Sequence, residues 1–219
     1  MADSCIVVGA GPGIGQAVAL AFAREGYDIA LIARHPQRLV AATTEIIWRT
    51  GREVHSYAGD AADPDSLRHA LHQARAELGV PRVLIYNVAQ VQRGRPLTID
   101  PEQLVRDFRA NTGGALLCAQ TLASDLRAAG GGSLLFTGGG LADHPSADYA
   151  SLSLGKAALR NLAFSLAQDL GPHNIHVATV TVHGFVQAGT HFDPHLIAQA
   201  FIKLHRQPRG RFDTELVYR

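Results

Sequence analysis

The sequence has little of the charge, the cysteine content and the long apolar runs that mark several functional classes. The formal net charge is +1 over 219 residues, so we expect no basic footprint for DNA, RNA or an anionic membrane. Two isolated cysteines, Cys5 and Cys118, exclude a disulfide framework. No apolar run approaches the ~18 residues of a membrane span, and a basic secretory n-region is lacking. These absences predict a cytoplasmic protein.

Metal binding is also not indicated. The 11 histidines include no His-Glu-x-x-His motif and no cysteine ligand set, so we predict no metal site. The content of 47% hydrophobic and 18% charged residues is ordinary for a soluble protein. Because there is no linker, repeat or low-complexity tract, residues 1–219 are predicted to form a single domain.

A glycine-rich turn stands between the first apolar run, 5–8, and an alanine-rich stretch, 16–24. Glycines let a backbone turn sharply and approach a ligand, and the free N–H groups of a helix start favour phosphate. The spacing is Gly-x-x-x-Gly-x-Gly rather than Gly-x-Gly-x-x-Gly, so the turn alone leaves two interpretations open, a dinucleotide site or an ordinary connection. The candidate pyrophosphate contacts are Gly9, Gly11, Pro12, Gly13, Ile14 and Gly15.

Apolar runs typical of strands alternate with helical stretches along the whole chain. Strands are predicted at 5–8, 27–33, 53–58, 83–86, 134–137, 175–182 and 212–218. Helices are predicted at 16–24, 36–48, 64–78, 101–129, 147–170 and 194–204. This alternation predicts an α/β, Rossmann-like doubly wound fold, with a mainly parallel sheet of about seven strands and helices on both faces.

Polar residues follow the second and third predicted strands. An NAD enzyme places an acidic residue after the second strand, whereas this chain has Arg34, a side chain that binds a 2′-phosphate through paired donors. The alternative is a solvated arginine at a helix start. Asp60, after the third strand, is either an adenine contact or a turn residue. We therefore favour NADP over NAD.

These motifs together resemble the short-chain dehydrogenase/reductase family over nearly the whole chain. The glycine turn and Asp60 resemble its nucleotide site, and Asn87 and Ala89 match its motif after the fourth strand. Asn111 and Lys156 stand in segments similar to those that carry its active-site Asn and Lys, and Gly184 in its usual Pro-Gly position. The resemblance implies that Lys156 hydrogen-bonds the nicotinamide ribose, and that the long helices at 101–129 and 147–170 form a homodimer or homotetramer.

The sequence departs from the family at two catalytic positions. The family's Tyr lies four residues before the Lys, where this chain has Leu152, and an ungapped count places Gly139 at the family's Ser. Tyr149 is seven residues before Lys156, on the same face of an ideal helix, and is a displaced candidate for the proton donor, with Thr137 in place of the Ser. The alternative is that Tyr149 only packs at the helix entrance.

Three functional hypotheses follow. The first is an NADP-dependent oxidoreductase that moves hydride between the cofactor and a small-molecule carbonyl or alcohol, with Lys156, Asn111 and Tyr149 or a water at its active site. The second is a catalytically silent protein that binds or senses NADP(H). The third is an oligomeric structural partner.

Overall fold

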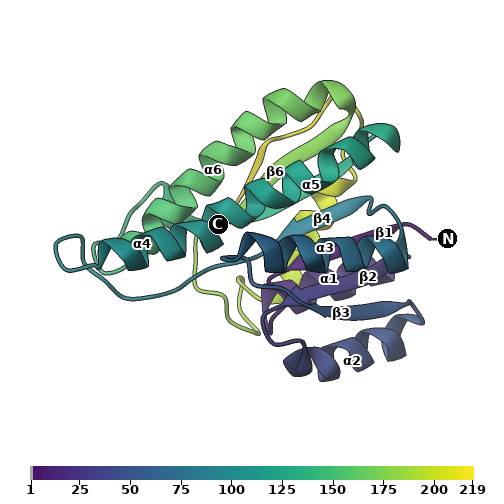
Figure 1. The fold of residues 1–219 in the computed structure, drawn as a ribbon, viewed down its shortest axis with the longest axis horizontal. Helices are drawn as coiled ribbons and strands as arrows, with labels where there is room; N and C mark the ends of the chain where they lie inside the picture. The colour runs from purple at the N-terminus through teal and green to yellow at the C-terminus, as the bar shows by residue number, and fades with distance from the viewer. Residues whose placement is uncertain (1) are drawn as a thin grey trace.

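The computed structural model describes residues 2–219, in which a seven-stranded sheet is covered by helices on both faces (Figure 1). The strands are β1 Ser4–Val8, β2 Asp28–Ala33, β3 Val54–Ala58, β4 Val83–Tyr86, β5 Gly132–Gly139, β6 Ile175–Val182 and β7 Glu215–Tyr218. They are all parallel, in the order β3-β2-β1-β4-β5-β6-β7. The predicted doubly wound fold is confirmed. Because the strand order reverses between β1 and β4, the fold opens a crevice for ligands at the carboxyl ends of those strands.

The α-helices are α1 Ile14–Arg24, α2 Val40–Thr50, α3 Pro64–Leu78, α4 Pro101–Phe108, α5 Gly114–Ala128, α6 Ala150–Leu170 and α7 Pro194–His205. Alternate strand residues point to opposite faces of the sheet, which divides the core in two. Cys5 and Val7 pack with α1, α2 and α7, whereas Ile6 and Val8 pack with α3, α5 and α6. In Figure 1, α3 and α5 lie in front of the sheet and α1 lies behind it.

The helix predicted at 101–129 is interrupted by a π-helical turn, Arg109–Gly113, which carries Asn111. The hydroxyl of Tyr86 donates to the carbonyl of Ala110 inside this turn, so a contact from β4 accompanies the change in helical pitch. Gly114 packs so closely that a β-carbon there would lie 2.8 Å from the Ala61 carbonyl oxygen. The single helix predicted at 101–129 is therefore divided into α4 and α5, and contacts from β4 and from the loop at Ala61 lie at the division.

Several other element boundaries differ from the predictions. The helix predicted at 36–48 begins as a 3₁₀ turn, Pro36–Leu39, and α2 ends at Thr50, with the C-cap Gly51 at a φ of +66°. β5 extends two residues beyond the predicted 134–137 at each end. α6 begins at Ala150, so Tyr149 is its N-cap. β7 is shorter than the predicted 212–218, and Phe212 before it stacks on His176, with ring centroids 4.4 Å apart.

Between residues 2 and 219, no helix combines the length and the apolar character needed to cross a bilayer. Over the same residues, no three His, Cys, Asp or Glu side chains gather as metal ligands would. Cys5 and Cys118 are both free and buried.

Candidate functional site

The glycine turn adopts conformations that require glycine. Gly9 and Gly13 have φ angles of +81° and +100°, which side chains disfavour. A β-carbon at Gly9 would lie 2.8 Å from the backbone of Asn87, and one at Gly15 would lie 2.7 Å from the Gly9 carbonyl oxygen. Gly13 caps α1 without a side-chain acceptor, so the N–H groups at the start of α1 point outward as an anion site. The local geometry thus suits a bound phosphate.

A cavity of about 280 Å³ opens beside this turn, at the carboxyl ends of β1, β2 and β4. Seven of the predicted cofactor residues line it: Gly9, Gly11, Pro12, Arg34, Asp60, Asn87 and Ala89. A β-carbon at Gly11 would meet no atom within 4 Å, so the turn leaves open space there. Residues 13–15 continue from this wall into α1, and Gly13 also lines a smaller cavity of about 160 Å³ between α1, α2 and the start of α7. The structure therefore brings these seven predicted residues to one cavity.

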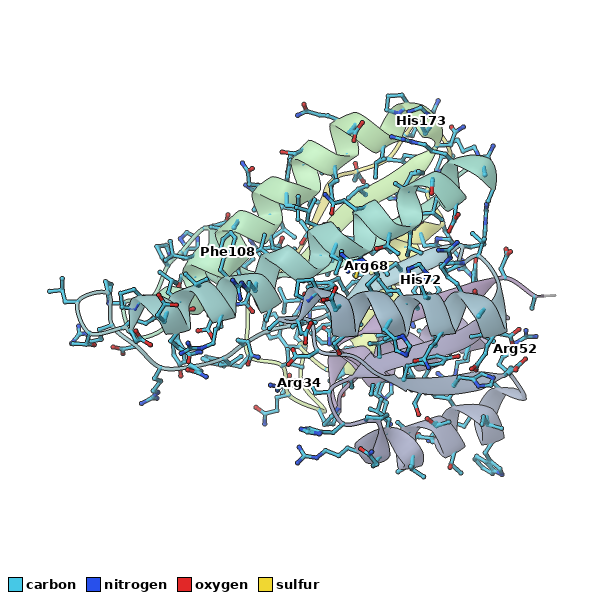
Figure 2. All side chains as sticks on the ribbon, in the orientation of Figure 1. Arg34, Arg52, Arg68, His72, Phe108 and His173 are labelled. Carbon is cyan, nitrogen blue, oxygen red and sulfur yellow. The ribbon has the colours of Figure 1, made fainter. Side chains whose placement is uncertain are left out.

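Two arginines line the end of the cavity next to β2. Arg34 follows β2 directly, and Arg38 lies in the 3₁₀ turn that begins at Pro36. Figure 2 shows Arg34 at the edge of the sheet where the strands end. Two guanidinium groups at one end of a cavity form a site for a phosphate dianion. Arg38 was not predicted. It lies four residues after Arg34, across the start of a helix, and this spacing is the sequence signal that could have identified it.

Asp60 has the turn role that was one of its two predicted alternatives, and the adenine contact stays a prediction. Its Oδ1 accepts a hydrogen bond from the Ala62 backbone N–H at 2.9 Å, which closes a turn. The residue also lines the cavity. Ser66 fixes this loop by accepting from the Asp60 N–H at 3.1 Å.

Two asparagines join the loops around the crevice. Asn87 donates through Nδ2 to the Gly9 carbonyl at 3.0 Å and accepts at Oδ1 from the Thr137 hydroxyl at 2.8 Å. Asn111, fully buried in the π-helical turn, accepts from the Gln90 backbone N–H at 2.7 Å. Its Nδ2 is buried and has no hydrogen-bond partner among the described residues. An unpaired donor of this kind fits a water or a ligand group.

Lys156 is a buried cation with a single backbone acceptor. Its ammonium donates to the Thr137 carbonyl at 2.6 Å, and no carboxylate lies within 4.0 Å of it among residues 2–219. Burial lowers the pKa of Lys156 to about 8. Its side-chain carbons lie 3.8 to 3.9 Å from where a β-carbon of Gly139 would be. Burying a charge without an ion-pair partner costs free energy, and such groups are concentrated at functional sites. The carboxyl end of β5 is therefore a candidate functional region.

Residues 4–192 match the sequence profile of the short chain dehydrogenase family. The chain belongs to this family. The sheet order and the crevice at the carboxyl ends of β1 and β4 are those of the family's dinucleotide-binding fold.

Relatives and solved structures agree with this assignment. The chain is 30% identical over 177 residues to a probable galactose dehydrogenase of Rhizobium meliloti, covering 80% of this chain and 68% of that protein. It is 30% identical over 168 residues to an uncharacterised oxidoreductase of Mycobacterium tuberculosis, covering 76% of this chain and 64% of that protein. The matches thus span about two thirds of these relatives' length. A metagenomic short-chain oxidoreductase solved in complex with NADP superposes with a TM-score of 0.89 at 27% identity, covering 98% of this chain and 96% of that one.

In this short-chain dehydrogenase, Tyr149 at the start of α6 contacts Arg93, a loop residue. Its phenol oxygen accepts from the Arg93 Nε at 3.2 Å, and the guanidinium carbon lies 5.8 Å from its ring centroid. Leu152 is 8% exposed, one helical turn before Lys156. The Thr137 hydroxyl, the predicted substitute for a serine, is already bound to Asn87.

Gly184 lies on the other side of the sheet end and does not line the large cavity. The ring of Phe192 covers its Cα so closely that no β-carbon would fit. The predicted site residues thus form a nucleotide group around the cavity and a second group, Asn111 and Lys156, near the ends of β4 and β5. Neither Tyr149 nor Gly184 lines the cavity with the first group.

Proposed function

We propose that this protein is an NADP-dependent oxidoreductase that transfers a hydride between the cofactor and a carbonyl or alcohol. The observation that carries the proposal is Lys156, a buried cation without an ion-pair partner among the described residues, which is connected through Thr137 to Asn87 in the wall of the cavity. A purely structural lysine at this depth is expected to have a carboxylate partner. The galactose dehydrogenase of Rhizobium meliloti and the NADP complex of the metagenomic enzyme support the same reaction class.

The residues present fit a dinucleotide. The open space at Gly11 and the two arginines that line the cavity leave room and donors for one. In this proposal, the turn at 9–15 binds the pyrophosphate, Arg34 and Arg38 bind the 2′-phosphate, and Asp60 accepts from the adenine. Lys156 donates to the nicotinamide ribose, as its resemblance to the family's Lys implies. When bound, NADPH supplies the hydride.

The chain differs from the family pattern at the proton donor, with Leu152 and Gly139 at the positions of the family's Tyr and Ser. Tyr149 is the displaced candidate for the donor, and its hydrogen bond with Arg93 holds the phenol at the entrance of α6. Asn111 holds its carboxamide Nδ2 free for a water that relays the proton.

The test of the function is oxidation of NADPH in the presence of a panel of aldehydes, ketones and quinones, followed by loss of the cofactor's absorbance. We expect turnover with at least one class, and Tyr149→Phe should lower it by ~10²–10⁴-fold if that phenol is the general acid. Binding of NADPH without turnover across the whole panel would favour a sensing protein instead.

NADPH is expected to bind more tightly than NADH, and Arg34→Ala should remove much of this preference. A charged hydrogen bond contributes roughly 1.5–3 kcal/mol, which corresponds to about a 10- to 100-fold change in affinity for NADPH. Calorimetric titration of both cofactors measures it. Arg24→Ala, at the far end of α1, is the matched control and should leave both affinities unchanged. Equal affinities in the unmodified protein would contradict the NADP assignment.

A silent cofactor-binding protein is the second candidate function. It is favoured by the apolar Leu152 and by Gly139, neither of which has a hydroxyl at the positions of the family's Tyr and Ser. In that case, the cavity and Lys156 contribute only to the binding of the cofactor and not to a reaction.

Assembly into a homodimer or homotetramer is proposed through α4, α5 and α6. Exposed apolar side chains gather on these helices, at Val105, Phe108, Leu116, Leu154 and Phe164. Phe108 is labelled at the end of α4 in Figure 2. Burial of such a surface against a second copy is favourable, because it removes apolar area from water.

A further inference from the structure

A histidine and an aspartate meet where β5 and β6 end. His183 directly follows β6, and Asp143 follows the 3₁₀ turn Gly140–Ala142 after β5. Nε2 of His183 lies 3.3 Å from Oδ2 of Asp143, and the His183 side chain is 12% exposed. This Nε2 is buried and lacks an aligned hydrogen bond, so a small rotation of either side chain completes the pair.

The same histidine borders the glycines next to Lys156. Gly139 pairs with Val182, so Gly140 and His183 are the next residues in register. A β-carbon at Gly140 would lie 3.0 Å from Nδ1 of His183, whereas one at Gly139 would lie 3.8 Å from carbons of Lys156. Consecutive Cα atoms are about 3.8 Å apart. His183 and Lys156 therefore flank one short stretch of backbone that has no side chains of its own.

The charged groups around the pair keep Asp143 available to the histidine. Arg160 of α6 lies 3.7 Å from Asp143, but its two closest contacts, at 2.9 and 2.6 Å, are with Glu215 of β7. The hydrogen bond from Arg160 lowers the pKa of Glu215. His144 faces the ring of His183 with centroids 5.9 Å apart. The closer contacts of Arg160 are thus with Glu215 rather than Asp143, and Glu215 is a second carboxylate that interacts with the charge of His183.

We propose that His183 is the proton donor and acceptor of this site, held in orientation by Asp143, for a carbonyl or alcohol seated over Gly139 and Gly140. The inference rests on the proposed hydride transfer and names the group that exchanges the proton. Asp143 faces Nε2, which fixes the neutral ring as the Nε2–H tautomer and leaves Nδ1 toward the glycines. The carboxylate also stabilises the imidazolium form, as in other His–carboxylate pairs.

In the reducing direction, the carbonyl carbon accepts a hydride from the dihydronicotinamide and forms a C–H bond. The π electron pair of the C=O bond moves to oxygen, which takes the proton from Nδ1 of the His183 imidazolium. The products are the alcohol, the oxidised nicotinamide and a neutral imidazole, which regains its proton from water. The reverse sequence oxidises an alcohol.

The other candidate groups are less well placed for this role. The phenol of Tyr149 is occupied by Arg93 at the entrance of α6, and Leu152 has no proton to give. The Thr137 hydroxyl is bound to Asn87. His183 is the group that combines a carboxylate partner with a position beside Gly140.

The first measurement is the protonation state of His183 by ¹⁵N NMR of histidine-labelled protein, with and without NADPH, assigned with His183→Gln. We expect the proton of the neutral ring on Nε2, which faces the Asp143 carboxylate. A proton on Nδ1 would overturn the inference.

The second measurement is the pH profile of NADPH-dependent carbonyl reduction. The rate should fall along a limb at rising pH, because reduction requires the imidazolium form of His183. His183→Gln should lower the rate by ~10²–10⁴-fold and lose this limb while NADPH affinity stays unchanged. Asp143→Asn should move the limb to lower pH. His144→Gln, a neighbouring exposed histidine, is the control and should keep both rate and profile.

The outcomes separate the inference from the proposed function. An active protein whose His183→Gln variant keeps its rate and pH limb overturns the inference alone, and loss of activity in Tyr149→Phe would then assign the proton to that phenol. A protein that binds NADPH but reduces nothing on the panel overturns the proposed function and the inference together.

Discussion

Lys156→Met is expected to weaken NADPH binding while it makes the cofactor-free protein more stable at pH 7. Methionine is close to lysine in length and apolar, so it fills the same buried space beside Gly139 without a charge. Loss of a charged donor to the ribose should cost about 1.5–3 kcal/mol of binding, or about a 10- to 100-fold rise in Kd. The same substitution removes the penalty of burying the ammonium.

The sign and pH window of the stability change follow from the pKa of Lys156. Burial lowers it from 10.5 to about 8, so the lysine is charged in both the folded and unfolded states at pH 7 and pays the burial penalty in the folded one. About 2.5 pKa units correspond to roughly 3 kcal/mol, and loss of the bond to the Thr137 carbonyl offsets about 1 kcal/mol. We expect Lys156→Met to be more stable by about 2 kcal/mol at pH 7. This difference in stability should shrink as the pH rises from 8 to 10.5, because Lys156 of the wild-type protein is then neutral in the folded state.

Urea unfolding at pH 7 and pH 9.5, with calorimetric titration of NADPH, measures both effects. Lys203→Met is the matched control, because Lys203 is the other lysine of the chain and lies exposed on α7. It should change neither stability nor affinity appreciably. An NADPH affinity unaltered in Lys156→Met would show that the ribose role implied by the family does not apply to this chain.

The sheet and its crevice were predictable because local patterns determine them. Strand residues such as Cys5 to Val8 are buried on both faces, so they read as an uninterrupted apolar run. Asp63 and Asp100, each followed by proline, cap α3 and α4 with side-chain hydrogen bonds as their sequence indicates. The glycine turn was predictable for the same reason, because its residues are contiguous in the sequence.

The π-helical turn at Asn111 was not predictable, because distant groups accompany it. Its carbonyl at Ala110 accepts from Tyr86 on β4, and Gly114 packs on the backbone of Ala61. No periodicity within 101–129 encodes these contacts. The position of Tyr149 was likewise set by a partner far along the chain, Arg93.

The candidate site was predicted where a motif is contiguous and missed where it is assembled across strands. Arg34 follows β2 directly, whereas the pairing of His183 with Asp143 requires the register of β5 against β6. Residues 40 positions apart give no local signal of such a contact. For the same reason, the sequence alone placed Gly139 at the family's Ser position only by an ungapped count of residues. The structure shows which atoms surround Gly139, so a serine at this position can be tested.

Leu152→Tyr combined with Gly139→Ser is expected to create or raise NADPH-dependent carbonyl reduction. The β5 end carries three glycines, and only the middle one accepts a side chain. At Gly138, a β-carbon would collide with the hydroxyl groups of Thr179 and Thr181, and at Gly140 it would press on His183. At Gly139, the φ of −162° is ordinary extended backbone, and the nearest atoms are Lys156 carbons at 3.8 to 3.9 Å. A serine there fits in van der Waals contact with the lysine.

The tyrosine at 152 would start one helical turn before Lys156, where the ammonium lowers the pKa of a phenol and favours proton transfer. Leu152 is 8% exposed, so the larger ring displaces neighbours at a cost of about 1–3 kcal/mol, which thermal unfolding will show. Relative to Leu152→Phe with Gly139→Ser, which has the same bulk without the phenol, we expect a gain in reduction rate of ~10²–10⁴-fold. Equal NADPH affinity in the two double variants would assign that gain to proton transfer. If both fold, both bind NADPH and neither exceeds the wild type on the carbonyl panel, residue 152 does not face the reacting carbonyl, and the ungapped alignment of Leu152 and Gly139 with the family's Tyr and Ser is wrong.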